Sequence, residues 1–273
     1  MSELTKRILF AVPAAALFLW LTWLGGWYFT TLIIILTFFI QKEMINIGDG
    51  AGFKTDEFFP YTFGLWIILS PKLPHPLEIG IGIFLFFLAV QIFKKKDVAV
   101  KELISTAFCS VYAPLGMLML LKLRNTGEPE TGFILTAALL LMVWGNDVFA
   151  YFGGKYLGKH KLAPEISPNK TWEGFGFGFV GAATGLLLIY YLVPIETPVE
   201  LYLMLPAAVL VSIFGPVGDL TVSRLKRAAN MKDTSHILPG HGGLLDRLDA
   251  LILAAPALYI FLVLLEELAY AAL

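Results

Sequence analysis

Charged side chains gather in the stretch from Asp219 to Asp249, which lies between two apolar runs, residues 201–217 and 250–265. Nine residues of this stretch carry charge, and a glycine-rich turn interrupts it. A charged side chain at the centre of a bilayer costs roughly 2.5–3.5 kcal/mol on insertion scales, so a chain that keeps so many beside membrane-length runs is expected to use them. The stretch is therefore interpreted as a polar reaction site at a membrane face.

Three carboxylates in this stretch suit a hard divalent cation. Asp219 follows the first apolar run, and Asp246 and Asp249 lie three residues apart at the start of the next predicted helix, on one face. Mg²⁺ takes oxygen ligands, typically one or two carboxylates together with substrate phosphates. The three acids are therefore candidate metal ligands. The alternative is that they complement a helix dipole or pair with neighbouring arginines.

Hydroxyl, amine and backbone groups that suit a phosphate accompany these acids. If the helix continues beyond Asp219, Ser223 at i+4 and Lys226 at i+7 lie on the same face. A turn of sequence Pro-Gly-His-Gly-Gly follows, with His241 at its centre. A histidine in such a turn is also explained by a role in shaping the loop.

A second polar cluster occupies residues 144–174. Asn146 and Asp147 end an apolar run, so Asp147 is expected to need a cation, a metal or a water-filled cavity. The next helix is expected to open with a turn made of Ser167, Pro168, Asn169, Lys170 and Thr171. Hydroxyls, a lysine and free N–H groups at a helix start can bind phosphate. With Glu173 in the first turn, the same residues are typical of ordinary helix capping, which this segment taken alone favours.

The elements that hold these clusters are predicted to be membrane helices. Hydrophobic residues make up 58% of the chain and charged residues 15%, outside the range of soluble globular domains. A helix needs about 17–25 residues to cross ~30 Å of hydrocarbon. Windows of that length predict an all-α, polytopic membrane protein with nine spans, centred on residues 8–24, 27–41, 58–72, 78–93, 103–121, 132–152, 174–194, 201–218 and 244–265. The second, third and fourth are the weakest.

The distribution of Lys and Arg predicts the orientation, because these residues concentrate in cytoplasmic loops. With the N-terminus in the cytoplasm, all but three of the 20 Lys and Arg residues fall on the cytoplasmic side. The exceptions are Lys72, Lys122 and Arg124. Both polar loops, residues 153–173 and 219–243, are therefore expected to face the cytoplasm, which means the inner face of the cell membrane if the protein is bacterial.

The chain is interpreted as one transmembrane domain over residues 1–273, with helices of generic character over 1–130 and catalytic helices over 131–273. A single cysteine, Cys109, excludes a disulfide within the chain and a Cys-rich metal site. Four glycines are spaced so that they share one helix face, where a neighbouring backbone can approach closely: Gly174, Gly178, Gly181 and Gly185. That neighbour belongs either to this chain or to a second copy, so a homodimer is one interpretation.

Residues 223–249, SRLKRAANMKDTSHILPGHGGLLDRLD, resemble the signature of the phosphatidate cytidylyltransferases, or CDP-diacylglycerol synthases. That pattern is Ser-x-apolar-Lys-Arg, four residues, Lys-Asp, and then apolar-Pro-x-His-Gly-Gly-apolar-x-Asp-Arg-apolar-Asp. The fixed positions are all matched, by Ser223, Lys226, Arg227, Lys232, Asp233, Pro239, His241, Gly242, Gly243, Asp246, Arg247 and Asp249. The segments SPNKTWEG at 167–174 and NDVFAYFGGKYLGKH at 146–160 are similar to family elements that precede it.

The resemblance implies an enzyme, a Mg²⁺-dependent nucleotidyltransferase that converts CTP and phosphatidic acid to CDP-diacylglycerol and pyrophosphate. Asp219, Asp246 and Asp249 are then the expected metal ligands and, with Lys226, the expected catalytic residues. Another divalent ion or an added monovalent cation is left open, and no nucleic-acid partner is expected. The groups expected to contact the substrates are Asn146, Asp147, Ser167, Lys170, Thr171, Ser223, Arg227, Lys232, His241, Gly242, Gly243 and Arg247.

Two other classes of protein fit part of the pattern. An ion-coupled transporter also places acids and broken helices at membrane depth. It predicts polar breaks in both halves, whereas the polar residues here lie almost wholly after residue 144. A CTP-dependent lipid kinase would use similar acids and bases, but it would transfer the γ-phosphoryl group and release CDP instead of pyrophosphate.

Overall fold

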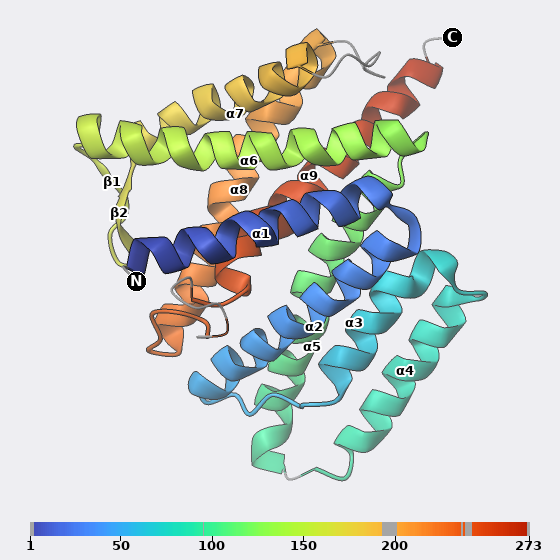
Figure 1. Cartoon of the computed structure of the whole chain (residues 1–273). Helices are drawn as coiled ribbons and strands as arrows, with labels where there is room; N and C mark the ends of the chain where they lie inside the picture. Colours follow the sequence, from blue (N-terminus) through green and yellow to red (C-terminus); the bar gives the residue numbers. More distant parts are fainter. Residues whose placement is uncertain (1–2, 95, 193–200, 236, 238–241, 272–273) are drawn as a thin grey trace. The chain divides into compact units, whose positions relative to one another are not determined.

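The computed structural model describes residues 3–94, 96–192, 201–235, 237 and 242–271 (Figure 1). Within them the elements of regular secondary structure are helices, apart from one short hairpin of two strands. The helices are α1 (Glu3–Leu24), α2 (Gly26–Gly50), α3 (Phe59–Leu69), a 3-10 turn (Ser70–Lys72), α4 (Pro76–Gln91), α5 (Lys96–Arg124), α6 (Pro129–Leu157), α7 (Trp172–Leu192), α8 (Leu201–Ala228) and α9 (Leu245–Ala271). The strands are β1 (Lys161–Ala163) and β2 (Ser167–Thr171), which pair antiparallel.

The apolar runs predicted from the sequence are each helical at their centres, so the positions of the helices are confirmed. Six helices of the described residues are long and apolar enough to cross a membrane, namely α2, α5, α6, α7, α8 and α9. The protein is therefore an integral, multi-pass membrane protein. Neither the count of nine spans nor the cytoplasmic N-terminus follows from this finding.

Helices α3 and α4 fall short of a full membrane span. At 1.5 Å per residue, the 11 residues of α3 rise roughly 16 Å and the 16 residues of α4 roughly 24 Å. A hydrocarbon core is about 30 Å thick, so each of these helices is shorter than the core that a full span must cross. Pro60 and Pro76 stand in the first turns of these helices, where the missing N–H of proline costs no helical hydrogen bond.

The chain divides into two compact units. The first comprises Met1–Leu21, Trp27–Leu118 and Leu225–Leu248, and the second comprises Thr22–Gly26, Met119–Arg224 and Asp249–Leu273. Each unit thus draws on segments from both ends of the chain. The signature-like segment, residues 223–249, contributes to both units.

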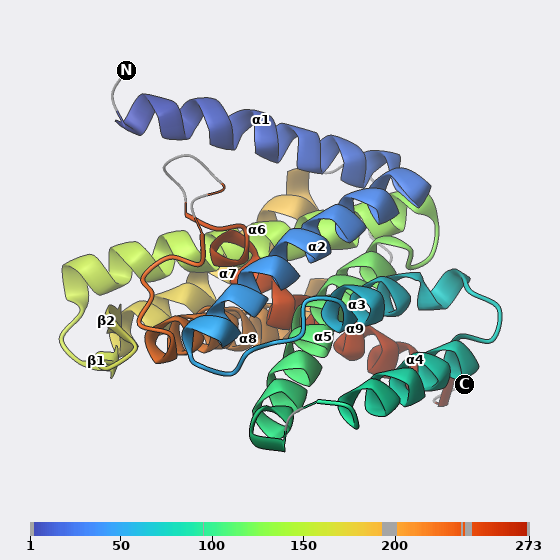
Figure 2. The same cartoon turned by 90° about the horizontal axis from the view of Figure 1, so that it is seen from below.

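The predicted glycine face packs α7 against α6 inside the second unit, where the two helices run side by side (Figure 2). A Cβ atom at Gly181 would collide with the backbone of Gly145, and one at Gly185 would collide with the backbone of Leu141. Glycine is therefore required for the close approach of the two helices. The neighbour is a helix of the same chain, and the homodimer stays a prediction.

The expected turn at residues 167–171 is wrong, because this segment forms β2. It pairs with β1, and the register places Lys161 opposite Thr171 and Ala163 opposite Ser167. The hairpin leads from the end of α6 to the start of α7 (Figure 1). A short polar strand of this kind depends on its partner strand for hydrogen bonds, and a pattern of residue types within one segment does not reveal that partner.

A three-membered ion cluster ties two loops of the first unit to helix α5. The Lys94 ammonium contacts the Asp56 carboxylate at 2.8 Å and also the Glu102 carboxylate. Burial pushes the pKa of Asp56 up, but hydrogen bonds from Lys94 and from two backbone N–H groups outweigh it and hold the pKa below the ordinary 3.8. Burial lowers the pKa of Lys94, and its two carboxylate partners outweigh that and raise it above the ordinary 10.5.

Candidate active site

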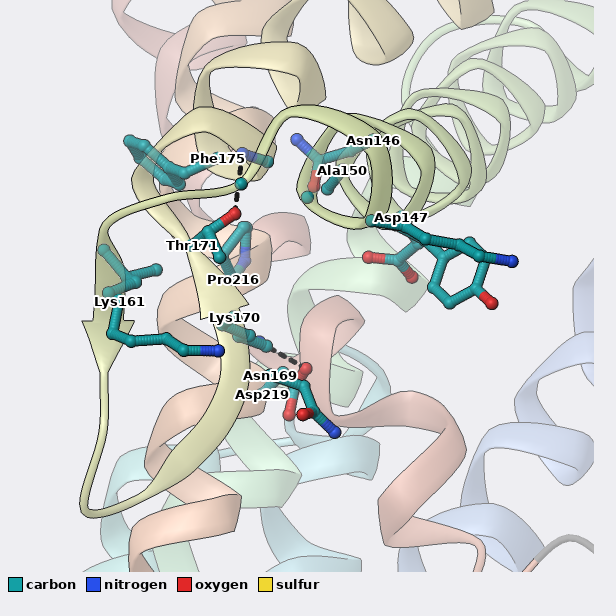
Figure 3. A pocket seen from close by; sticks show the side chains of 16 residues that line it. Asn146, Asp147, Ala150, Lys161, Asn169, Lys170, Thr171, Phe175, Pro216 and Asp219 are labelled. Atoms are coloured by element: carbon teal, nitrogen blue, oxygen red, sulfur yellow. Dashed lines mark hydrogen bonds and ion pairs between the residues drawn. The ribbon is translucent and has the colours of Figure 1, made fainter.

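The second unit contains a cavity of about 630 Å³, shown in Figure 3. Helix α6 contributes Asn146 and Asp147, strand β2 contributes Lys170 and Thr171, and helix α8 contributes Asp219. Five of the residues predicted to form the site therefore line one cavity. Ser167, which was predicted with them, is not among the residues that line it.

An ion pair joins two sides of this cavity. The Lys170 ammonium lies 2.5 Å from Asp219 Oδ2 (Figure 3). The hydroxyl of Ser223 donates a hydrogen bond of 3.2 Å to Asp219 Oδ1. Ser223 follows Asp219 by one helical turn because α8 continues to Ala228, as predicted. The strand and the helix together place a cation beside an acid, an arrangement that suits a phosphate bound with a metal ion.

Asn146, which lines the cavity, has a side-chain hydrogen-bond donor without a partner among the described residues. Its side chain is 2% exposed, and its Nδ2 amide has no hydrogen-bond partner among the described residues. A Cβ at Gly178 would lie 2.6 Å from that nitrogen, so glycine at this position of α7 makes room for the amide. A buried donor without a partner costs free energy unless something supplies an acceptor, which points to a ligand in this cavity.

The start of α7 shows the capping chemistry that was the alternative for this segment. The Thr171 hydroxyl accepts a hydrogen bond of 3.1 Å from the N–H of Gly174, three residues later, which is the N-cap geometry. Glu173 accepts hydrogen bonds from the backbone N–H of His160, and one of its oxygens lies 2.6 Å from the ring Nδ1 of that residue. Thr171 therefore caps a helix and also lines the cavity.

A third carboxylate belongs to the same unit. Asp249, in the second turn of α9, is 9% exposed and accepts a hydrogen bond of 2.7 Å from the N–H of Ala250. Its charge interacts with those of Asp219, Asp147 and Lys170. Three acids and one lysine of this unit are thus near enough for their charges to influence one another, and neighbouring like charges favour the binding of a cation.

The first unit holds the other half of the predicted residues. Asp246, in the first turn of α9, accepts a hydrogen bond of 2.6 Å from the Lys226 ammonium through Oδ1. Its Oδ2 accepts from the N–H of Thr234 at 2.9 Å and from the N–H of Gly243 at 3.1 Å, and the Thr234 hydroxyl lies 3.0 Å from it. The amide of Gly243 therefore binds a carboxylate of the chain itself.

The remaining predicted residues of this segment are near the surface or outside the described residues. Arg227, Lys232 and Arg247 are exposed, and Arg227 donates to the carbonyl of Met231 at 3.1 Å. Gly242 has φ +78°, which a residue with a side chain rarely adopts. His241, like Pro239, lies outside the described residues.

One polar residue that sequence reasoning missed is Glu43, in α2 of the first unit. Its carboxylate is fully buried, with 0% exposure, and it is bonded to the segment that leads into α9. The predicted span ended at residue 41, whereas α2 continues to Gly50 and carries this acid inside the fold. An acid immediately after an apolar run was the only signal in the sequence, and many loop residues share it.

The predicted magnesium site remains a prediction. Among the described residues, no three or more His, Cys, Asp or Glu side chains are grouped closely enough to hold a metal ion. Lysine ammonium groups stand beside the two main candidate ligands, Asp219 and Asp246. In chemical type the donors do fit, because carboxylate oxygens are the ligands that Mg²⁺ prefers.

Comparisons with known proteins agree with these features. A family model described as the cytidylyltransferase family matches residues 5–265. A protein of Bacillus subtilis (strain 168), named phosphatidate cytidylyltransferase, is 34% identical over 275 residues, covering 97% of this chain and 99% of the relative. Proteins of the same name from Brucella melitensis and Staphylococcus aureus (strain COL) are 34% and 33% identical, over 96% and 94% of this chain and 94% and 98% of their own lengths.

Proposed function

The chain belongs to the cytidylyltransferase family, and we propose that it transfers the cytidylyl group of CTP to phosphatidic acid, giving CDP-diacylglycerol and pyrophosphate. Relatives that carry the name of this activity match the chain over nearly its whole length. The chain is therefore a nucleotidyltransferase of phospholipid synthesis. The observation that carries the proposal for the site is the cavity in which Lys170 faces Asp219 and the Asn146 amide has no partner among the described residues.

The reaction needs charge neutralisation more than it needs a strong base. The phosphate of phosphatidic acid is already an anion near neutral pH, and it attacks the α-phosphorus of CTP while pyrophosphate leaves. Lys170 would hold phosphoryl oxygens in the cavity of the second unit, because its ammonium is a mobile point charge with three donors. The Nδ2 amide of Asn146 would donate to an acceptor of the nucleotide.

The first unit would supply further cationic groups. Lys226 is held by Asp246, and the exposed side chains of Arg227 and Lys232 follow on the same segment. Arginine and lysine side chains bind phosphate through charge-assisted hydrogen bonds, which are roughly twice as strong as neutral ones. We propose that these residues contact the polyphosphate of CTP or the headgroup of the lipid.

Mg²⁺ is proposed as the cofactor. When bound, such an ion would neutralise charge on the nucleotide phosphates and on the departing pyrophosphate. In the second unit Asp219 and Asp249 would hold it, since their charges already interact and their oxygens suit a hard cation. The resemblance of residues 223–249 adds Asp246 to the proposed ligands.

We also propose that the N-terminus and the two polar loops face the cytoplasm. The support is the distribution of Lys and Arg, of which all but three of the 20 fall on one side in the nine-helix arrangement. The short helices α3 and α4 do not affect this orientation. Whether the pair crosses the membrane twice or enters and leaves from one side, the loops before α3 and after α4 lie on the same side.

The test is release of pyrophosphate by the purified protein. We expect pyrophosphate to form from CTP only when phosphatidic acid and Mg²⁺ are both present. Release of CDP in its place would identify a lipid kinase and overturn the proposal.

The role of Lys170 is tested with a matched lysine from the same connection between α6 and α7. Lys170→Met should raise the KM for CTP about tenfold, because a charge-assisted contact to phosphate is lost. Lys159→Met, at an exposed lysine that does not line the cavity, should leave the KM near the wild-type value. An equal KM in the two variants would remove Lys170 from the nucleotide site.

A further inference from the structure

Glu43 binds a distant part of the chain with both of its carboxylate oxygens. Oε1 accepts hydrogen bonds from the Ser235 hydroxyl at 2.5 Å and from the N–H of Leu244 at 2.9 Å. Oε2 accepts from the Thr234 hydroxyl at 2.7 Å and from the N–H of Leu245 at 2.8 Å. Four donors, all about 190–200 residues later in the chain, thus converge on one carboxylate.

These contacts hold both ends of the glycine-rich turn. Thr234 and Ser235 precede the turn, while Leu244 and Leu245 follow it, and Leu245 is the first residue of α9. The first N–H groups of a helix have no partners within the helix, so Glu43 acts as a cap supplied by another helix. A buried carboxylate is stable only when donors replace the lost water, and these four donors do so.

The hydrogen bonds of Glu43 are linked to Asp246 through Thr234. The Thr234 hydroxyl lies within hydrogen-bond distance of Glu43 Oε2 and of Asp246 Oδ2, at 2.7 and 3.0 Å. The N–H groups of Thr234 and Gly243 both donate to Asp246 Oδ2. Whatever fixes Thr234 and Gly243 therefore fixes the orientation of the Asp246 carboxylate, and with it the Lys226 ammonium on the other oxygen.

Glu43 lies so close to the backbone of residue 243 that only glycine fits there. A Cβ atom at residue 243 would lie 2.5 Å from Glu43 Oε2 and would overlap the Thr234 hydroxyl. A side chain at this position would force the carboxylate and the turn apart. The second glycine of the Gly-Gly pair is thus explained by contact with Glu43.

We propose that Glu43 is a positioning residue, which holds Thr234, Ser235, Leu244 and Leu245 in place so that Asp246 and Lys226 keep their orientation for the transfer reaction. Glu43 contacts neither substrate in this proposal. The inference rests on the proposed function, because it assigns Glu43 an effect on turnover through Asp246.

The first test replaces the carboxylate by an amide of equal size. In Glu43→Gln the NH₂ group must face one backbone N–H, of Leu244 or of Leu245, in either orientation of the amide. We expect kcat to fall about tenfold, which corresponds to about 1.4 kcal/mol in the barrier. The control is Glu102→Gln, which alters another buried acid of the same unit whose partner is Lys94. It should lower the unfolding temperature and leave kcat unchanged.

A second pair of variants keeps the inference testable if Glu43→Gln does not fold. Thr234→Val removes the hydroxyl that lies between Glu43 and Asp246, whereas Thr234→Ser retains it. The valine variant should lose kcat by about tenfold and the serine variant should keep it. Equal kcat values for the valine and serine variants would overturn the inference, as would equal losses in Glu43→Gln and Glu102→Gln.

Failure of this inference is distinguishable from failure of the proposed function. If the wild-type protein makes CDP-diacylglycerol and Asp246→Asn does not, the proposed function stands. A wild-type kcat in Glu43→Gln would then reject the positioning role alone. If Asp246→Asn is as active as the wild type, the assignment of Asp246 falls first, and the role of Glu43 falls with it.

Discussion

Variants of the ion pair between Lys226 and Asp246 can distinguish an effect on folding from an effect on catalysis. The two side chains are only 12% and 9% exposed, and their oxygen and nitrogen atoms lie 2.6 Å apart. Removing one partner of a buried pair leaves a charge without compensation, which typically costs about 3–5 kcal/mol. We therefore expect Asp246→Asn alone to be both inactive and destabilised by about that amount.

The double variant Lys226→Met/Asp246→Asn removes both charges together. Replacing a buried pair by uncharged side chains of similar volume is often neutral, because the cost of burying two ions is removed as well. The amide oxygen of the new asparagine can still accept from the N–H groups of Thr234 and Gly243. We expect most of the lost stability to return, to within about 1 kcal/mol of the wild type, while activity stays lost.

The assay combines unfolding in detergent, followed by circular dichroism, with formation of CDP-diacylglycerol by the same preparations. Recovery of activity together with stability in the double variant would show that the pair serves only to stabilise the fold. A single variant as stable as the wild type would show that the pair is not buried in the way described. Either result would refute the reasoning.

Three further predictions concern packing, metal binding and pH. Gly181→Ala should destabilise the protein by about 1–3 kcal/mol, because the new methyl group meets the α6 backbone. Gly176→Ala, where a Cβ has open space, should be neutral or slightly stabilising. The unfolding midpoints of the two variants test this difference. Asp219→Asn should raise the Mg²⁺ concentration needed for half-maximal activity, and an unchanged titration would remove Asp219 from the metal site. The cluster of Asp56 and Lys94 should stabilise the fold between the ordinary pKa values of 3.8 and 10.5. Its contribution should be lost as acid titrates Asp56 below 3.8 or as base titrates Lys94 above 10.5. Unfolding midpoints of Asp56→Asn and of the wild type, compared across pH, would reveal both losses.

The helices were predictable because each is marked by an apolar run, and a run is a local property of the sequence. The lengths of α3 and α4 were harder, because the windows placed over them included the loop residues and the 3-10 turn at their ends. Lys72 and His75, which stand between these two helices, carry no signal that distinguishes a short hairpin from two full spans. Helical length, not hydropathy, decides that question.

Many residues that form the polar contacts were predicted from the sequence, but only some of their partners were. Asp219 and Lys170 were both expected at the site, yet their ion pair depends on β2, and the sequence suggested a turn at that place. Thr171 was expected either to cap a helix or to bind phosphate, and the structure shows the cap. The sequence alone could not distinguish these two roles, because the same residue types serve both purposes.

Glu43 could not be found from spacing, because its partners lie about 190 residues away. A buried acid is recognisable only when the donors around it are known, and here all four belong to the segment near α9. The glycine at position 243 had an unexplained role for the same reason, since the group that it approaches comes from α2. Long-range pairings of this kind require the folded structure.

The position of the transferred phosphorus tests the proposed chemistry most directly. Purified protein would be incubated with phosphatidic acid, Mg²⁺ and CTP that carries the label either on its α-phosphate or on its γ-phosphate. Cytidylyl transfer predicts that only the α-label becomes extractable with lipid and that the γ-label stays in water as pyrophosphate. Lipid that carries the γ-label would contradict it.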